Sequence, residues 1–246
     1  MAFRTSNPIL KDKNFRDAEF TTSKRMTING TLNKALLMLL LLSVTASFVW
    51  HKATSGDLGT VTSLMFLGMI GSLGFILYTV FTKKINAVTS LGYAAFEGLM
   101  IGGLSAILNM SYPGIVMQAV TITFGIAFGM FAMYRYGIIK VTDKFRMGVM
   151  GATGGIFVIY MLNMVLGMFG IQVPFIHSTG MFGIGFSVFV IGIASLNLVL
   201  DFDFIDRATK NGASEEMEWM GAFGLMVTLI WLYVEVLRLL SLLNRR

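Results

Sequence analysis

Seven long apolar stretches occupy most of this chain and limit what it can fold into. They cover residues 33–50, 58–82, 87–109, 112–134, 147–170, 178–201 and 219–242. An α-helix needs about 20 apolar residues to cross the hydrocarbon core of a bilayer. Membrane-spanning β-strands would instead alternate polar and apolar residues over about 10 positions, whereas residues 35–42 are apolar without a break. The pattern predicts an all-α integral membrane protein with seven transmembrane helices.

The charge content agrees with this prediction. Only 13% of the 246 residues are charged, against about 25% in soluble globular domains. So few charges could not cover a water-exposed body of this size, and seven spans leave no room for a separate soluble domain. We therefore expect a polar cytoplasmic tail over residues 1–30 and one transmembrane domain over residues 31–246.

The positions of the basic residues predict the orientation in the membrane. Cytoplasmic loops of membrane proteins carry an excess of Lys and Arg. On one side of the predicted spans lie Arg4, Lys11, Lys13, Arg16, Lys24, Arg25, Lys34, Lys83, Lys84, Arg135, Lys140, Lys144, Arg146, Arg207 and Lys210. The other side has Lys52, followed by the discordant terminal pair Arg245 and Arg246. We expect a cytoplasmic N-terminus and an external C-terminus, and this distribution accounts for the net charge of +6 without a nucleic-acid partner.

The sequence offers little for metal or covalent chemistry. Cysteine is absent, and the two histidines, His51 and His177, lie far apart at predicted loop edges. We expect no metal site and no cofactor. An intramembrane serine protease would need a Gly-x-Ser-x-Gly pattern, but Ser187 has no Gly two residues later. We therefore expect no enzymatic activity.

Ionisable residues inside the predicted spans are the main functional candidates, because burying a charge in a membrane is expensive. Glu97 lies in the middle of the third span, where no cation of its own span can neutralise it. Asp201 lies at the cytoplasmic end of the sixth span, four residues after Asn197, so the two share a helix face. Glu235 and Arg238 lie in the seventh span.

Each of these candidates also has a simpler structural interpretation. Glu235 and Arg238 are three residues apart and can form a local ion pair. Asp203 and Asp206 can be hydrated loop carboxylates, although Asp203 is also a candidate for a pH sensor. Two carboxylates that face each other would share a proton, and their deprotonated oxygens would suit Ca²⁺.

Glycines inside the spans form three pairs with four-residue spacing. Such pairs share one helix face and allow two helix backbones to approach closely. We expect these pairs to serve ordinary helix packing: Gly98 with Gly102, Gly125 with Gly129, and Gly151 with Gly155.

Three segments resemble the Bax inhibitor-1/YccA family, also called the transmembrane BAX-inhibitor-motif family, and its bacterial branch in particular. The similarity runs in order from about residue 30 to the end of the chain. The segments are Phe96-Glu97-Gly98-Leu99 with Gly102; residues 197–205, which read Asn-Leu-Val-Leu-Asp-Phe-Asp-Phe-Ile; and residues 217–240, which include Gly221-Ala222-Phe223-Gly224-Leu225 and Trp231-Leu232-Tyr233-Val234-Glu235.

The resemblance implies six helices packed around a central seventh helix, in a bacterial inner membrane. It also implies a pH-sensitive cation leak, chiefly for Ca²⁺, controlled by two aspartates near the cytoplasmic mouth. Asp201 matches the first aspartate. The second position falls on Thr228 or on Glu235, depending on the alignment.

The same resemblance implies a basic latch residue on the second span. It also leaves open a second function that involves no transport. Lys83 and Lys84 are the nearest matches to the family's latch, and Arg238 is a further candidate cation. The alternative function is an interaction protein without transport, which modulates a membrane-anchored AAA protease through its cytoplasmic tail. Deleting residues 1–28 would separate the two, since a leak would survive the deletion.

Overall fold

The computed structural model describes residues 24–169 and 180–245, and its regular structure there is helical. The helices are α2 (Ile28–Thr54), α3 (Leu58–Thr82), α4 (Ala87–Ser111), α5 (Ile115–Arg135), α6 (Asp143–Met168), α8 (Met181–Lys210) and α9 (Met217–Asn244). All seven are long and apolar enough to cross a membrane. The predicted fold class is therefore confirmed.

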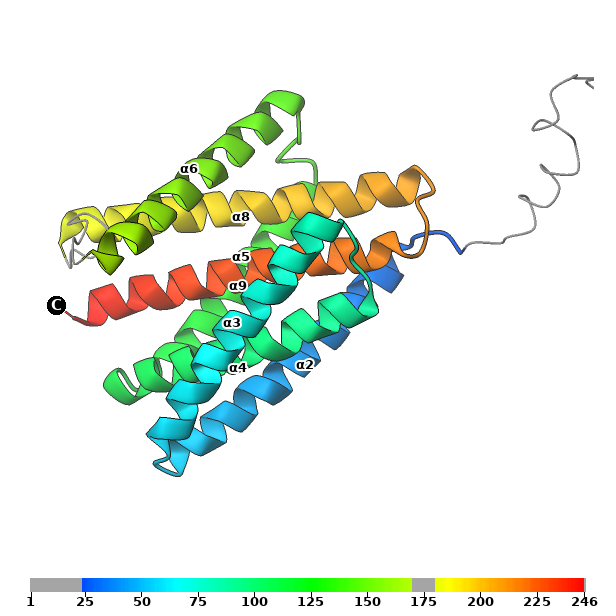
Figure 1. The fold of residues 1–246 in the computed structure, drawn as a ribbon. Helices are drawn as coiled ribbons and strands as arrows, with labels where there is room; N and C mark the ends of the chain where they lie inside the picture. The colour runs from blue at the N-terminus through cyan, green and yellow to red at the C-terminus, as the bar shows by residue number, and fades with distance from the viewer. Residues whose placement is uncertain (1–23, 170–179, 246) are drawn as a thin grey trace, which may run out of the picture.

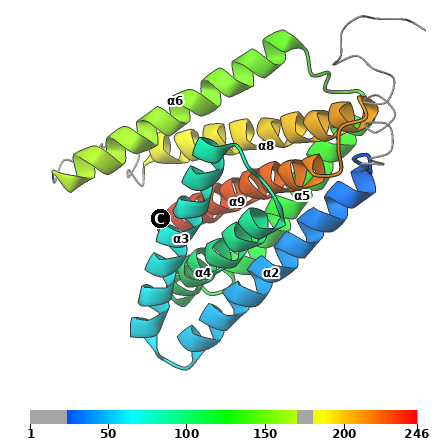
Figure 2. The same ribbon diagram turned by 45° about the vertical axis from the view of Figure 1, so that its right-hand side comes forward.

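Helix α9 lies at the centre of the bundle, as expected. Helices α2, α4, α5 and α8 pack directly against it, whereas α3 joins the bundle through α4 and α2. Figures 1 and 2 show α9 between α8 on one side and α2, α3 and α4 on the other. Helix α6 packs along α8 and diverges from the rest of the bundle (Figures 1 and 2).

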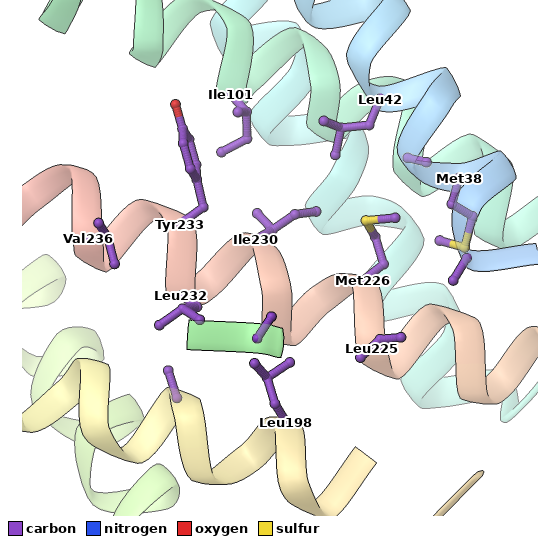
Figure 3. Packing of buried hydrophobic residues seen from close by; sticks show 14 of the residues in the cluster. Met38, Leu42, Ile101, Leu198, Leu225, Met226, Ile230, Leu232, Tyr233 and Val236 are labelled. Atoms are coloured by element: carbon purple, nitrogen blue, oxygen red, sulfur yellow. The ribbon is translucent and has the colours of Figure 1, made fainter. Parts of the chain in front are cut away.

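Apolar side chains project from opposite faces of α9 into the core. Figure 3 shows Met226 and Ile230 directed toward α2 and α4, while Leu232 points toward Leu198 of α8. One polar contact crosses this core, a hydrogen bond of 2.7 Å between the hydroxyls of Ser105 and Tyr233. Lipid tails are as apolar as these side chains, so close packing rather than water exclusion stabilises the contacts.

Short capped connections join the first three helices. Asp57 caps α3 by accepting a hydrogen bond from the Thr60 backbone N–H at 3.1 Å. Hydrogen bonds from Thr60 hold the pKa of the exposed Asp57 below its usual range. Asn86 and Thr89 form a reciprocal capping box at the start of α4. These caps satisfy backbone groups at helix ends that have no partner inside the helix.

The first helix begins earlier than the predicted tail boundary. Thr27 caps α2, and Met26 is 2% exposed. The carboxylate of Glu218 on α9 accepts hydrogen bonds from the backbone N–H of Thr27 at 2.8 Å and from Lys34 at 2.7 Å. The segment just before α2 is thus part of the folded domain. Residues 1–23 of the predicted tail, and residues 170–179 between the predicted fifth and sixth spans, lie outside the described residues.

Of the three glycine pairs, one makes a close helix contact within the described part of the chain. A Cβ on Gly102 would lie 2.7 Å from the backbone of Ala46, and a Cβ on Gly98 would meet Thr45 and the Leu42 carbonyl. These two glycines let α4 pack against α2. The other four, namely Gly125, Gly129, Gly151 and Gly155, have no described atom within 4 Å of such a Cβ.

We predict that Gly98→Ala destabilises the protein by about 1–3 kcal/mol, because the added methyl group forces α4 away from α2. Thermal unfolding of the purified protein in detergent measures this change. Gly125→Ala is the matched control, since it adds the same methyl group to a helix where nothing obstructs it. Equal losses in the two variants would contradict the packing role of Gly98.

Candidate functional site

A row of polar side chains runs along the interface of α6 with α8 and α9. Helix α6 contributes Arg146, Thr153 and Tyr160, which are spaced seven residues apart. Seven residues are almost two helical turns, so these side chains share one face. Each of them contacts a polar side chain of α8 or α9.

At the end of this row on the predicted cytoplasmic side, Asp203 of α8 is held between two arginines. Its carboxylate lies 2.8 Å from Arg146 of α6 and 2.8 Å from Arg207 on the next turn of α8. Arg207 also donates a hydrogen bond of 3.0 Å to the carbonyl of Val141. These contacts connect α8 to α6 and to the segment that leads into it.

The interpretation of Asp203 and Asp206 as hydrated loop carboxylates is wrong for Asp203 and incomplete for Asp206. Helix α8 continues past the predicted end of its span to Lys210, so both residues are helical. Asp203 is only 5% exposed. Asp206 is partly exposed; it pairs with Lys210 at 2.6 Å and accepts a hydrogen bond from the Tyr134 hydroxyl at 3.3 Å.

Asp201 lies deeper, where α8 faces α9. Its carboxyl group lies beside the side chain of Thr228, whose hydroxyl donates a hydrogen bond of 3.1 Å to the Gly224 carbonyl. Its Oδ2 atom is buried without a hydrogen-bond partner among the described residues. A Cβ on Gly224 would lie 3.6 Å from the Asp201 Oδ1 atom, an ordinary van der Waals contact, so this position borders the carboxyl group.

Asn197 lies one turn before Asp201 and connects α8 to α6. Its Nδ2 atom donates hydrogen bonds to the Thr153 hydroxyl at 2.7 Å and to the Ile193 carbonyl at 2.9 Å. Thr153 is one of the α6 residues that the sequence reasoning missed. The sequence feature that could have revealed it is the seven-residue spacing that it shares with Arg146 and Tyr160.

Glu235 and Arg238 form the local pair that their spacing predicts, with 3.6 Å between the Arg238 Nη1 and Glu235 Oε2 atoms. Tyr160 of α6 completes the group. Its hydroxyl donates to Glu235 Oε1 at 2.5 Å and accepts from Arg238 at 2.6 Å. The Arg238 guanidinium also lies 5.5 Å from the centre of the Phe186 ring. This half-buried group joins α6 to α9 in the half of the membrane away from the predicted cytoplasmic side.

The structure places Thr228, rather than Glu235, beside Asp201. Glu235 is two helical turns further along α9, about 10 Å away along the helix axis, and contacts Tyr160 and Arg238 instead. Within the described residues, Asp201 therefore faces a hydroxyl and not a second carboxylate.

Three other candidates lie apart from this row. Glu97 is 6% exposed and its carboxyl group lies near Ser72 of α3, whose hydroxyl donates to the Met69 carbonyl. Lys83 and Lys84 are exposed at the end of α3 and make no ion pair with the described acids. In that part of the chain, the cations that do reach buried carboxylates are Lys34, Arg146, Arg207 and Arg238.

No group of three His, Cys, Asp or Glu residues could hold a metal ion among the described residues. Ser187 is fully buried within α8, and its hydroxyl has no hydrogen-bond partner in the same part of the chain. His177 lies outside the described residues.

We predict that Asp203→Asn lowers the free energy of unfolding by about 1–3 kcal/mol, because it removes a buried charge that two arginines contact. Asp206→Asn serves as the control, and its partly exposed pair with Lys210 should contribute about 0.5 kcal/mol or less. Thermal unfolding in detergent compares the two variants. Equal losses of stability in Asp203→Asn and Asp206→Asn would show that the contacts of Asp203 with the two arginines contribute no more than the partly exposed pair of Asp206.

The comparisons with known proteins agree with this architecture. The family model for Bax inhibitor 1 like proteins matches residues 7–245, which is almost the whole chain. No curated protein and no solved structure matches the chain significantly. The family match and the seven apolar helices identify a multi-pass membrane protein. This chain belongs to the Bax inhibitor 1 like family.

Proposed function

We propose that this protein is a pH-sensitive cation leak, chiefly for Ca²⁺, that conducts along the interface of α6, α8 and α9. The observation that carries the proposal is the series of polar groups spaced along this interface. From the cytoplasmic end it consists of Arg146 with Asp203, Asp201 with Thr228, Asn197 with Thr153, and Tyr160 with Glu235 and Arg238.

Asp201 is the natural control point of this series. The carboxylates on either side of it, Asp203 and Glu235, each have an arginine within 4 Å. Asp201 instead lies beside the Thr228 hydroxyl and forms no ion pair with a cation among the described residues, and its Oδ2 atom has no hydrogen-bond partner there. A carboxylate in such a place is stable either when it is protonated or when a cation is beside it. Exchange between these two states would couple cation passage to pH.

The chemistry of the site suits a hard cation. Ca²⁺ takes oxygen ligands from carboxylates, carbonyls and hydroxyl groups or water. The Asp201 carboxyl and the Thr228 hydroxyl supply two such oxygens at one level of the bundle. The tight pairing of Asp203 with two arginines would keep the cytoplasmic mouth closed until those contacts separate.

We predict that proteoliposomes containing the purified protein pass Ca²⁺ at a rate that changes between pH 6 and 8. Asp201→Asn should remove most of that pH dependence, because the amide cannot gain or lose the proton. Asp206→Asn is the control, since this carboxylate belongs to the same helix and lies partly exposed at its end. Well-folded protein without flux at any pH would rule out the leak.

We predict a several-fold higher Ca²⁺ flux for Tyr160→Phe, because the loss of the hydroxyl disconnects α6 from the Glu235 and Arg238 pair and lets it separate from α9. The same proteoliposome assay measures it. Tyr78→Phe is the matched control, because Tyr78 is 49% exposed on α3 and away from the interface. Unchanged flux in Tyr160→Phe would exclude this part of the proposed path.

We further propose a bacterial inner membrane location with the N-terminus in the cytoplasm and the C-terminus outside. The basic residues at the start of α2 and between α3 and α4, α5 and α6, and α8 and α9 support this orientation. The alternative, a non-transporting modulator of a membrane-anchored protease, would depend on the N-terminal tail. Its test is deletion of residues 1–23 rather than 1–28, because Met26 and Thr27 pack into the domain. A leak should survive this deletion.

A further inference from the structure

A lateral groove separates α2 from α5, although both helices pack on α9. It contains a cavity of about 880 Å³ in the half near the end of α5, and an adjoining cavity of about 330 Å³ beyond it. Both cavities are lined by Leu39, Phe124, Met226 and Leu229, so they adjoin each other along α9. Each volume falls within the roughly 300–1,000 Å³ that is typical of ligand sites.

The walls of this groove are apolar and open toward the lipid. Leu32 and Leu36 of α2 line one wall, and Phe128 and Phe131 of α5 line the other. These side chains are exposed at the surface of the bundle, Leu36 by 55% and Phe128 by 69%. A membrane-spanning protein exposes this surface to acyl chains, so an acyl chain can enter the groove from the side.

The end of the groove on the predicted cytoplasmic side is basic. Arg135, Lys140 and Lys210 line the larger cavity there, together with Asp206. Asp206 pairs with Lys210 at 2.6 Å. Arg135 and Lys140 are exposed and form no ion pair with an acid in the described part of the chain. Three cations against one carboxylate leave a net positive charge beside the apolar space.

We propose that this groove binds one anionic phospholipid, with an acyl chain between α2 and α5 and its phosphate at Arg135, Lys140 and Lys210. The order of the two parts matches the lipid, because the basic rim lies at the helix ends and the apolar walls extend into the membrane. A guanidinium binds phosphate through two hydrogen bonds, and lysine ammonium groups add point charges. A free anion would leave the apolar part of the groove empty. A lipid without net charge would gain little from the basic residues at the end of the groove.

Native mass spectrometry of the full chain released from detergent tests the headgroup part of this proposal. We expect the protein to retain phosphatidylglycerol roughly tenfold better than phosphatidylcholine with identical chains. The double variant Arg135→Gln with Lys140→Gln should lose this preference. Lys83→Gln with Lys84→Gln should keep it, since those lysines carry the same charge on the same side of the membrane but do not line the groove.

The acyl-chain part has its own matched pair of variants. Leu36→Trp should reduce retention of phosphatidylglycerol, because the larger ring narrows the groove. Leu40→Trp should not, since Leu40 is 64% exposed on the same helix but does not line either cavity. Glycerol phosphate, the headgroup without chains, should not displace the lipid.

Several outcomes would overturn the proposal. Equal retention of the two lipids by the unmodified protein would contradict a site that selects the anionic headgroup. An equal loss in the Lys83 and Lys84 variant would reduce the effect to general surface charge. Displacement by glycerol phosphate would point to an anion site without a lipid. None of these results depends on whether the protein conducts Ca²⁺, so they test the groove separately from the proposed leak.

Discussion

Ion pairs between helices organise the bundle, because a charged side chain at the membrane is stabilised by a partner inside the protein. Lipid offers no hydrogen bonds and stabilises no isolated charge. Lys34 and Glu218 form such a pair between α2 and α9, where the Glu218 carboxylate also binds the cap of α2. Arg146 and Asp203 do the same between α6 and α8. Because these partners come from different helices, the pairing determines which helices must be neighbours.

The two sides of α9 consequently differ in character. Toward α2 and α4 the contact is close and mainly apolar, with Gly98 and Gly102 allowing α4 to reach α2. Toward α8 and α6 the contact carries Asp201, Glu235 and Tyr160. Helix α6 lies apart from the main body and packs chiefly on α8. A helix whose contacts include several polar pairs can separate from its neighbours when the charges on those pairs change, which is the behaviour that the proposed leak requires.

The groove between α2 and α5 follows from the same arrangement. Both helices are positioned by α9, and they are not drawn to each other by a charged pair in the described residues. Large side chains such as Phe124 and Phe128 border the resulting space without closing it. This is the space that we propose a lipid occupies, with the basic residues at its end on the predicted cytoplasmic side selecting which lipid enters.

The amino-acid sequence by itself determined the features that depend on local pattern. Hydropathy and segment length were enough for the seven helices, and the spacing of Glu235 and Arg238 was enough for their pair. The central place of α9 followed from the family resemblance and was confirmed. The burial of Asp203 and the roles of Arg146 and Tyr160 were not predicted, because each depends on a partner more than fifty residues away. Only the tertiary structure decided that Gly98 is packed while Gly125 is free, and that Thr228 rather than Glu235 lies beside Asp201. The physical reason is that the sequence of a helix does not show which of its faces will meet a neighbour. That depends on how the helices pack in three dimensions.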